Sequence, residues 1–380
     1  MVTLSDPEKQ IYIALASIEG VGEKTLQNIL SWCEKSGDNL ETCWQRGSWP
    51  ETIFFSRSTY QRYCGVVGQA SFVKNVCSQL RELQITPVVK GDTEYPKLLK
   101  EAMGAPSILY CRGELSLLSC SVPISVVGAR HMSAYGKRAT QVIAAELIKA
   151  GATVVSGFMY GVDVTAHLAA LDADGGSIGV LGFGLDQMYP NSQRELFQDL
   201  LRRKMLFISQ FPPGTQARAG NFLQRNQVVA GLSWAVVVTE AGFPSGSFST
   251  AQAALDEGRL VCAVPGPFDS QYSQGTKWLI NEGATLVTSG SQVLTELGFP
   301  VYVESERTSG SGSEKNLSVV VERLTEKEKL VFEAVIKQTG EMESIIKQTN
   351  FSASELSALL TELELKGLLV AVGDTWQIAL

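Results

Sequence analysis

The chain has 380 residues, more than one hydrophobic core usually organises, so we expect two or three domains. Hydrophobic residues make up 44% and charged residues 19%, an ordinary globular composition, and no apolar run suggests a membrane span or secretory signal, so we expect a cytoplasmic protein without membrane contact. The net charge of −7 repels a polyanion at long range, so a nucleic-acid site would have to be a local basic patch.

The seven cysteines are odd in number and form no Cys-x-x-Cys pair, which disfavours a disulfide framework or a structural zinc site. We expect reduced, mostly buried thiols. The chain has two histidines and no acidic cluster beside them, so no metal site is predicted.

The first predicted elements lie within residues 1–85. The stretch "IALASIEGVGEKTLQNIL", from Ile13 to Leu30, places two apolar helical segments around a tight glycine turn. This pattern is typical of a helix-hairpin-helix, in which the second helix directs its N-terminus at a nucleic-acid phosphate. A plain α-helical hairpin with a glycine cap is the alternative. We assign residues 1–85 to an N-terminal all-α domain of the helix-hairpin-helix or SAM-like kind.

The middle of the chain repeats an apolar run, a turn and a helical pattern. Seven such runs begin near residues 123, 152, 177, 206, 234, 259 and 284. Each run is continuously apolar, as expected for strands buried on both faces, and the intervals are long enough for crossover helices. The pattern predicts a doubly wound parallel sheet within residues 86–303.

Ligands of such sheets bind at the carboxyl ends of the strands. The residues there are mostly glycine, serine and single charged or amide residues, and we expect them to form one rim. They are Gly128, Arg130, Ser156, Gly157, Gly182, Gly184, Gln210, Glu240, Pro265 and Gly266.

A polar linker and a third domain follow the predicted sheet. Residues 304–318 are rich in glycine and serine, and residues 319–380 predict three helices and a β-hairpin, the order of a winged helix. Ser352 and Glu355 fit a capping box, and Gly367 fits the end of the third helix. Residues 319–380 contain ten acidic and six cationic residues, so we favour protein contact over reading of a DNA groove.

The first turn of the predicted sheet, "GARHMSAYG", lacks the Gly-x-Gly-x-x-Gly spacing of a dinucleotide site. Arg130 could instead contact a phosphate or stack on a base. Ser133 is a predicted N-cap, which places Lys137 and Arg138 in the first turns of the next helix. The alternative is that Arg130 forms an ion pair with Glu240 or Asp163.

Two further segments contribute to the predicted rim. Asp163 is placed to cap a helix, and His167 follows one turn later as a hydrogen-bonded structural residue. The segment "FLQRNQ", from Phe222 to Gln227, precedes a short apolar helix and suits unstacked bases. The alternative is an ordinary loop with local pairing of Arg225. The sequence offers no set of a nucleophile, a general base and a residue that orients the base, so no catalytic residues are predicted.

These motifs together resemble the DNA processing protein (DprA or Smf) family. The matching stretches include "VVGARHMSAYG", "VVSGFMYGVDVTAH", "FLQRNQVVAGLS" and "VVVTEAGFPSGSFSTAQAAL", in family order over about 200 residues. The resemblance implies an extended Rossmann-like domain and a homodimer that binds single-stranded DNA without sequence preference. It also implies a non-enzymatic protein without cofactor that delivers DNA to the RecA recombinase, in the presence of single-strand-binding protein, during natural transformation.

The resemblance carries specific residues into a predicted DNA site. The family's Gly-Ser/Ala-Arg matches Gly128, Ala129 and Arg130, its Ser-Gly matches Ser156 and Gly157, and its Arg-Asn matches Arg225 and Asn226. The chain departs from the family at Gln210, Leu223, Gln227 and Lys277. The complete set of predicted DNA contacts is Gly128, Ala129, Arg130, Lys137, Arg138, Ser156, Gly157, Phe222, Arg225, Asn226 and Lys277.

Two other functions fit parts of the sequence. "SGSFSTAQAA" is similar to the loop of phosphoribohydrolases that act on nucleoside monophosphates, but Ala253 stands where their catalytic glutamate would be. The other alternative is an interaction scaffold whose main function lies in the acidic domain 319–380. Deletion of that domain distinguishes the two hypotheses, because DNA binding at the rim should largely survive the deletion.

Overall fold

The computed structural model describes residues 4–47, 49–299, 325–337, 342–349, 351–365, 369–372 and 375–378. The chain divides into two compact units, Met1–Leu297 and Gly298–Leu380, and each is described by itself. The predicted linker 304–318 and Gly367 lie outside the described residues. The proposed domain boundaries at residues 85 and 303 therefore stay predictions. The last N-terminal helix ends at Glu82 and the first strand of the sheet begins at Thr86, close to the first boundary.

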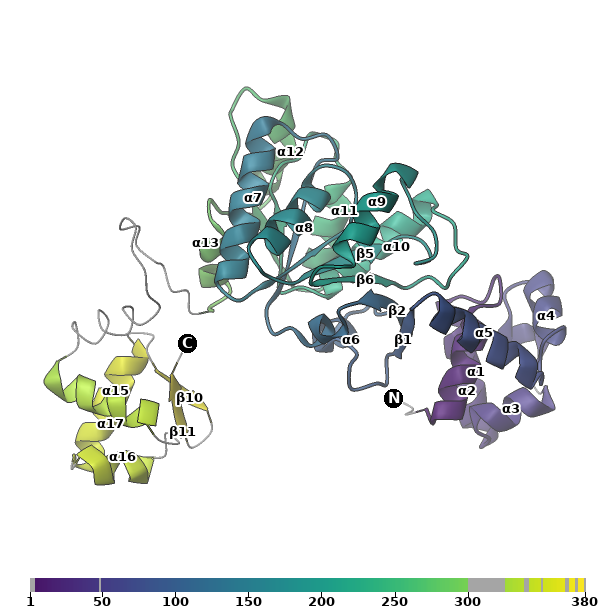
Figure 1. The fold of residues 1–380 in the computed structure, drawn as a ribbon, viewed down its shortest axis with the longest axis horizontal. Coiled ribbons are helices and arrows are strands. Elements are labelled where there is room, and N and C mark those ends of the chain that lie inside the picture. Colours follow the sequence, from purple (N-terminus) through teal and green to yellow (C-terminus); the bar gives the residue numbers. More distant parts are fainter. Residues whose placement is uncertain are drawn as a thin grey trace. The chain divides into compact units, whose positions relative to one another are not determined.

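The first unit begins with a group of helices (Figure 1). Their buried core includes several aromatic side chains. The helices are α1 (Asp6–Ala16), α2 (Glu23–Ser36), α3 (Leu40–Arg46), α4 (Arg57–Cys64) and α5 (Ala70–Glu82). Gly20 turns the chain between α1 and α2 at a φ of 90°, a conformation that favours glycine. The helix pair expected around this glycine turn is therefore present.

The N-terminus of α2 lies against the segment that precedes the second strand. Glu23, in the first turn of α2, accepts a hydrogen bond of 2.9 Å from the backbone N–H of Ser107 and another from its hydroxyl. A carboxylate therefore occupies the helix end at which the helix-hairpin-helix interpretation expects a DNA phosphate. The fold of the pair is confirmed, and its contact with phosphate stays a prediction.

A nine-stranded sheet forms the centre of the unit, in the order β1-β2-β6-β5-β4-β3-β7-β8-β9. The strands β3 to β9 are parallel, which confirms the predicted doubly wound sheet. The strands β1 and β2 were not predicted from the sequence: β1 forms one edge of the sheet and pairs antiparallel with β2, which pairs antiparallel with β6. The bounds are β1 (Thr86–Val89), β2 (Ile108–Gly113), β3 (Pro123–Val127), β4 (Thr153–Ser156), β5 (Ser177–Leu181), β6 (Met205–Ser209), β7 (Ala235–Val238), β8 (Leu260–Ala263) and β9 (Thr285–Leu286).

Helices cover both faces of the sheet. The core on the α8 and α9 face is continuous with the core of the N-terminal helices, whereas α10 and α11 pack on the other face. Both faces are therefore buried, as the continuously apolar strands predict. The helices are α6 (Lys97–Glu101), α7 (Ala134–Lys149), α8 (Val162–Asp172), α9 (Arg194–Leu200), α10 (Ala219–Gly231), α11 (Ser247–Asp256), α12 (Gln274–Asn281) and α13 (Gly290–Glu296).

The second unit has the predicted winged-helix order of three helices and an antiparallel hairpin. These are α15 (Glu326–Lys337), α16 (Met342–Thr349), α17 (Ala353–Leu365), β10 (Leu369–Val372) and β11 (Thr375–Ile378). Phe332, Leu356 and Leu360 are among its buried core residues. Ser352 Oγ accepts a hydrogen bond of 3.3 Å from the N–H of Glu355, which confirms its capping of α17.

Two further properties of the described residues concern membranes and metals. None of their helices is both long and apolar enough to cross a membrane. They contain no group of three or more metal-ligating side chains placed to hold an ion. All seven cysteines lie in the described part of the chain, and none of them is in a disulfide bond there.

Candidate functional site

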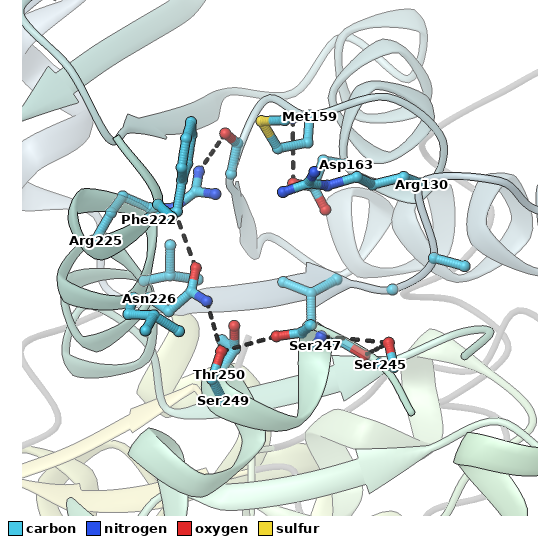
Figure 2. Close-up of a pocket in the computed structure, with 18 of the residues that line it drawn as sticks. Arg130, Met159, Asp163, Phe222, Arg225, Asn226, Ser245, Ser247, Ser249 and Thr250 are labelled. Carbon is cyan, nitrogen blue, oxygen red and sulfur yellow. Dashed lines mark hydrogen bonds between the residues drawn. The ribbon is translucent and has the colours of Figure 1, made fainter. Parts of the chain in front are cut away.

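A cavity of about 690 Å³ opens at the carboxyl ends of β3 and β7 (Figure 2). The chain leaves β3 toward β4 on one side, whereas β7 lies on its other side, so this is the point where the strand order reverses. Open α/β sheets bind ligands at such switch points. The lining residues come from the loop after β3, from the start of α8, from α10 and from the N-terminal turn of α11.

Glu240, just after β7, holds the loop that follows β3. Its backbone carbonyl accepts a hydrogen bond of 2.8 Å from Ala129 N–H, and its carboxylate accepts from Ser133 N–H at 2.7 Å and Ser133 Oγ at 2.5 Å. Ser133 Oγ in turn accepts from Gly136 N–H, which confirms it as the N-cap of α7. The Glu240 carboxylate is thus bound by Ser133, and no ion pair with Arg130 forms.

The close approach of Glu240 explains two glycines of "GARHMSAYG". A Cβ atom at Gly128 would lie 2.6 Å from the Glu240 carbonyl oxygen, closer than real Cβ contacts allow. A Cβ at Gly136 would overlap the Glu240 carboxylate itself. The loop is therefore shaped by packing against the end of β7 rather than by a bound pyrophosphate.

Two buried side chains of opposite charge, which form no ion pair within 4.0 Å, line the pocket. Arg225 is 4% exposed, and its guanidinium donates to the carbonyls of Gly157 and, at 2.6 Å, of Val180. Asp163 is 8% exposed and accepts a hydrogen bond of 3.2 Å from Met159 N–H. Burial raises the pKa of Asp163, and the charge of Arg225 opposes that rise. Burial also lowers the pKa of Arg225 to about 10, which leaves it cationic at neutral pH.

The position of Arg225 differs from the sequence interpretation in two ways. The segment 222–227 lies inside helix α10 and is not a loop before a helix. The Arg225 side chain connects the ends of β4 and β5 and does not face solvent. A direct contact between this guanidinium and DNA would require these protein hydrogen bonds to break.

Three other polar residues in or near this region are structural. Ser156 is fully buried, and its Oγ donates to the Val126 carbonyl at 2.6 Å. Asp163 lies in the first turn of α8, but the N-cap is Gly161. His167 is fully buried, with its Nδ1 2.7 Å from Ser177 Oγ, and burial lowers its pKa to about 3. The histidine is therefore neutral and hydrogen-bonded, in agreement with the structural role expected for it.

Two exposed arginines line the mouth of the cavity. Arg130 follows β3, and Arg218 precedes α10. Within the described part of the chain, neither side chain forms an ion pair shorter than 4.0 Å or a hydrogen bond. Arg130 points toward Asp163 in Figure 2, and its charge helps to stabilise the Asp163 carboxylate. Because Arg225 and Asp163 balance each other, the pocket carries surplus positive charge.

The sequence interpretation did not single out Arg218. The one sequence feature that could have indicated it is its position four residues, or about one helical turn, before Phe222. It lies outside the stretches that match the family. Because it faces the same cavity as Arg130, the basic patch is larger than the motif "GAR" predicts.

The opposite wall of the pocket combines an aromatic ring with amide and hydroxyl groups. Phe222 lies 5.7 Å from Tyr189 between ring centroids, and the Arg225 guanidinium carbon is 5.7 Å from the Phe222 centroid. Asn226 Nδ2 donates to Ser249 Oγ at 2.8 Å, which connects α10 to the first turn of α11. Flat and hydrogen-bonding groups thus lie on one side of the cavity, with cations at its mouth.

Several predicted contacts lie outside this cavity. Lys137 and Arg138 are exposed on α7, and Arg138 lines a second cavity of about 320 Å³ with Tyr135 and Val264. Lys277, on α12, donates to the Phe268 carbonyl. Of the departures from the family pattern, Leu223 lines the main cavity, but Gln210 and Gln227 do not. The cavity therefore brings together part of the predicted DNA contacts and leaves three of the predicted cations, Lys137, Arg138 and Lys277, outside.

The lining supports binding more readily than bond cleavage. Ser245, two residues before the start of α11, has its hydroxyl 2.8 Å from that of Ser247 and not beside a base. Ala253 lies within α11, so a glutamate is absent where the phosphoribohydrolase loop would need one. The guanidinium groups can hold phosphates and the Phe222 ring can contact a base.

Comparison with known proteins agrees with these features. The family profile for DNA recombination-mediator protein A matches residues 86–298, and the DprA winged-helix profile matches residues 321–374. The chain is 30% identical to Protein Smf of Synechocystis over 398 aligned residues, covering 96% of this chain and 97% of that protein. It is 40% identical to DNA processing protein DprA of Streptococcus pneumoniae over 208 residues, covering 55% and 73%.

Solved structures show the same relationship. The crystal structure of Streptococcus pneumoniae DprA aligns with a TM-score of 0.64 at 29% identity, covering 78% of this chain and 99% of that one. A Helicobacter pylori DNA processing protein A, whose structure addresses its single-stranded DNA binding mode, aligns with a TM-score of 0.50 at 28% identity, covering 56% and 95%. With its sheet, its winged helix and both family profiles in agreement, the chain belongs to the DNA processing protein A (DprA/Smf) family.

Proposed function

We propose that this chain binds single-stranded DNA without sequence preference at the cavity between β3 and β7. The observation that carries the proposal is the pair Arg130 and Arg218, both exposed, without ion pairs among the described residues, and lining one cavity with Phe222. Phosphates suit the guanidinium groups, and unpaired bases expose faces that can contact the ring. The single-stranded DNA binding mode studied in the Helicobacter pylori relative supports the same class of ligand.

Within this proposal the predicted contacts divide by position. Gly128, Ala129, Arg130, Phe222 and Asn226 line the cavity and would meet the strand. Ser156 and Arg225 would not touch the DNA but would hold the ends of the β-strands around Gly157 in position. Lys137, Arg138 and Lys277 would extend the cationic path outside the cavity. Without a catalytic constellation, the protein would act as a carrier and not as an enzyme.

Further roles follow from membership of the family. The chain would act as a homodimer and deliver DNA to a RecA recombinase on strands covered by single-strand-binding protein, in recombination and natural transformation. An assay of RecA filament formation on DNA covered by single-strand-binding protein tests this delivery. The wild-type protein should shorten the lag before filament growth, and the Arg130→Glu variant should not.

The DNA site itself is tested by charge reversal. Arg130→Glu removes one phosphate contact and adds repulsion, so affinity for random single-stranded oligonucleotides should fall roughly a hundredfold at low salt. The slope of log affinity against log salt should also decrease by about one. Arg57→Glu is the matched control, because Arg57 is an exposed arginine in α4. Absence of DNA binding by the wild-type protein at low salt would overturn the proposal.

A further inference from the structure

Three aromatic side chains form a surface cluster outside the cavity. Phe243, Phe248 and Trp278 have ring centroids 5.0 to 5.8 Å apart. Phe243 is 56% exposed and Trp278 is 40% exposed, so neither is explained as a core residue. Exposed apolar groups that gather at one place usually mark a binding surface.

The cluster adjoins the candidate DNA site along the chain and in space. Phe243 lies two residues before Ser245, and Phe248 lies between Ser247 and Ser249, and these three serines line the cavity. The first turn of α11 therefore contributes serines to the cavity and also carries Phe248, whose ring contacts those of Phe243 and Trp278. A ligand that leaves the cavity across this turn meets the cluster next.

The rings are held in place by the packing of α12. Gly275 N–H donates to the Ala241 carbonyl at 2.7 Å, and a Cβ at Gly275 would lie 2.8 Å from the Ala241 side chain. The helix that carries Trp278 is thus fixed against the segment that leads to Phe243. A preformed arrangement of rings lowers the ordering cost of a ligand that stacks on it.

We propose that Phe243, Phe248 and Trp278 form a stacking platform for the bases of single-stranded DNA that leaves the cavity. The proposal rests on the proposed function, because it needs a strand in the cavity. Aromatic rings suit this ligand, since every base has a flat face and stacking tolerates any sequence. Continuity with the cavity is the reason to choose a nucleic-acid strand over a protein partner as the occupant.

The charges near the platform determine how it acts. Lys277 precedes Trp278, but the acidic residues Asp269 and Glu282 lie in the same loop and helix region of the sequence. With both signs present, the platform contributes contact with bases and little net attraction for phosphates. Loss of its rings should therefore weaken binding without changing the dependence on salt, unlike loss of Arg130.

The test uses the full-length protein and thymidine oligonucleotides of graded length in fluorescence anisotropy. Phe243→Ala and Trp278→Ala should each weaken binding of long oligonucleotides roughly tenfold, and leave the shortest binding oligonucleotides unaffected. Phe55→Ala is the matched control, because Phe55 is 70% exposed on the N-terminal helical part. Trp278→Phe keeps a ring and should retain most of the affinity.

The outcomes separate this proposal from the proposed function. Suppose that Arg130→Glu abolishes binding of oligonucleotides of all lengths, whereas Phe243→Ala and Trp278→Ala bind long oligonucleotides as the wild type does. The stacking platform is then wrong, and the cavity remains the DNA site. If the wild type binds no oligonucleotide, the proposed function fails first. A change in the molar mass of Phe243→Ala in solution, with DNA affinity intact, would assign the cluster to contact between copies of the chain and overturn the platform. Should Trp278→Ala unfold, the more exposed Phe243 still decides the question.

Discussion

The carboxyl edge of the sheet and the third helix of the winged helix are both places where proteins of these folds contact nucleic acid, but their charges are opposite. Arg130 and Arg218 are exposed at the sheet edge. The exposed residues of α17 include Glu355, Glu362 and Glu364. The fold of a winged helix therefore does not by itself make a DNA reader, and the charge on its exposed helix face decides.

The two regions also differ in how their charges are supported. At the sheet edge, the exposed arginines line the same cavity as the buried Arg225 and Asp163, whose charges influence each other, and the loop of Arg130 is held by Glu240. In the winged helix, Lys327 and Glu355 form a solvent-exposed pair at 2.5 Å. Exposed pairs contribute little, whereas breaking a buried pair is costly. Substitutions of the buried residues at the sheet edge should therefore change stability as well as binding, whereas those of the exposed arginines should change mainly binding.

The largest effect is expected from Arg225→Ala. The substitution leaves Asp163 buried without its compensating charge and frees the carbonyls of Gly157 and Val180. The free energy of unfolding should fall by about 3–5 kcal/mol in a denaturant titration. Arg130→Ala, at an exposed position, should change it by less than about 0.5 kcal/mol. An Arg225→Ala protein of normal stability that fails to bind DNA would instead make Arg225 a direct contact, as the sequence suggested.

The second effect tests how tightly Glu240 holds the loop. Gly136→Ala places a Cβ against the Glu240 carboxylate, so we expect a loss of about 1–3 kcal/mol in unfolding free energy. DNA affinity should fall as well, because the loop that carries Arg130 must shift. Gly220→Ala is the control: Gly220 lies in α10 with no atom near its missing Cβ, and alanine there should be neutral or slightly stabilising. Equal stability of both variants would show that the loop yields easily.

Sequence patterns predicted the parallel strands and the Ser133 cap because these depend on local periodicity and on neighbours within a few residues. The role of Arg225 could not be predicted in the same way. Its acceptors at Gly157 and Val180 lie 68 and 45 residues away, and only tertiary packing brings them together. Arg218 was missed because its importance comes from the cavity it faces and not from a motif.

Acid titration tests the buried state of His167 in α8. The folded protein holds His167 neutral with a pKa of about 3, against about 6.5 when unfolded, so the unfolded state binds one more proton between these values. Stability should therefore fall as pH drops below about 6.5, with His167 contributing up to about 1.4 kcal/mol per pH unit. His167→Asn, which can keep the bond to Ser177, should lose this contribution.

The difference between wild type and His167→Asn is the informative quantity. Asp163 has a raised pKa in the folded state and so acts with the opposite sign, but it is common to both proteins. Free energies of unfolding at about pH 7 and pH 5 give the comparison. Identical pH dependence in the two proteins would mean that His167 is not buried neutral in solution.

The smallest effect is expected from the winged helix. Glu362→Gln combined with Glu364→Gln removes two exposed negative charges from α17, while Glu355 keeps its pair with Lys327. If the sheet edge binds the strand, DNA affinity at physiological salt should change by no more than about twofold, because exposed charges are screened beyond about 8 Å. Affinity that rises tenfold, with a steeper dependence on salt, would place α17 against the phosphates. Both regions would then contact DNA, and they would differ only in affinity. The acidic residues of α17 would weaken a DNA contact that this helix itself makes.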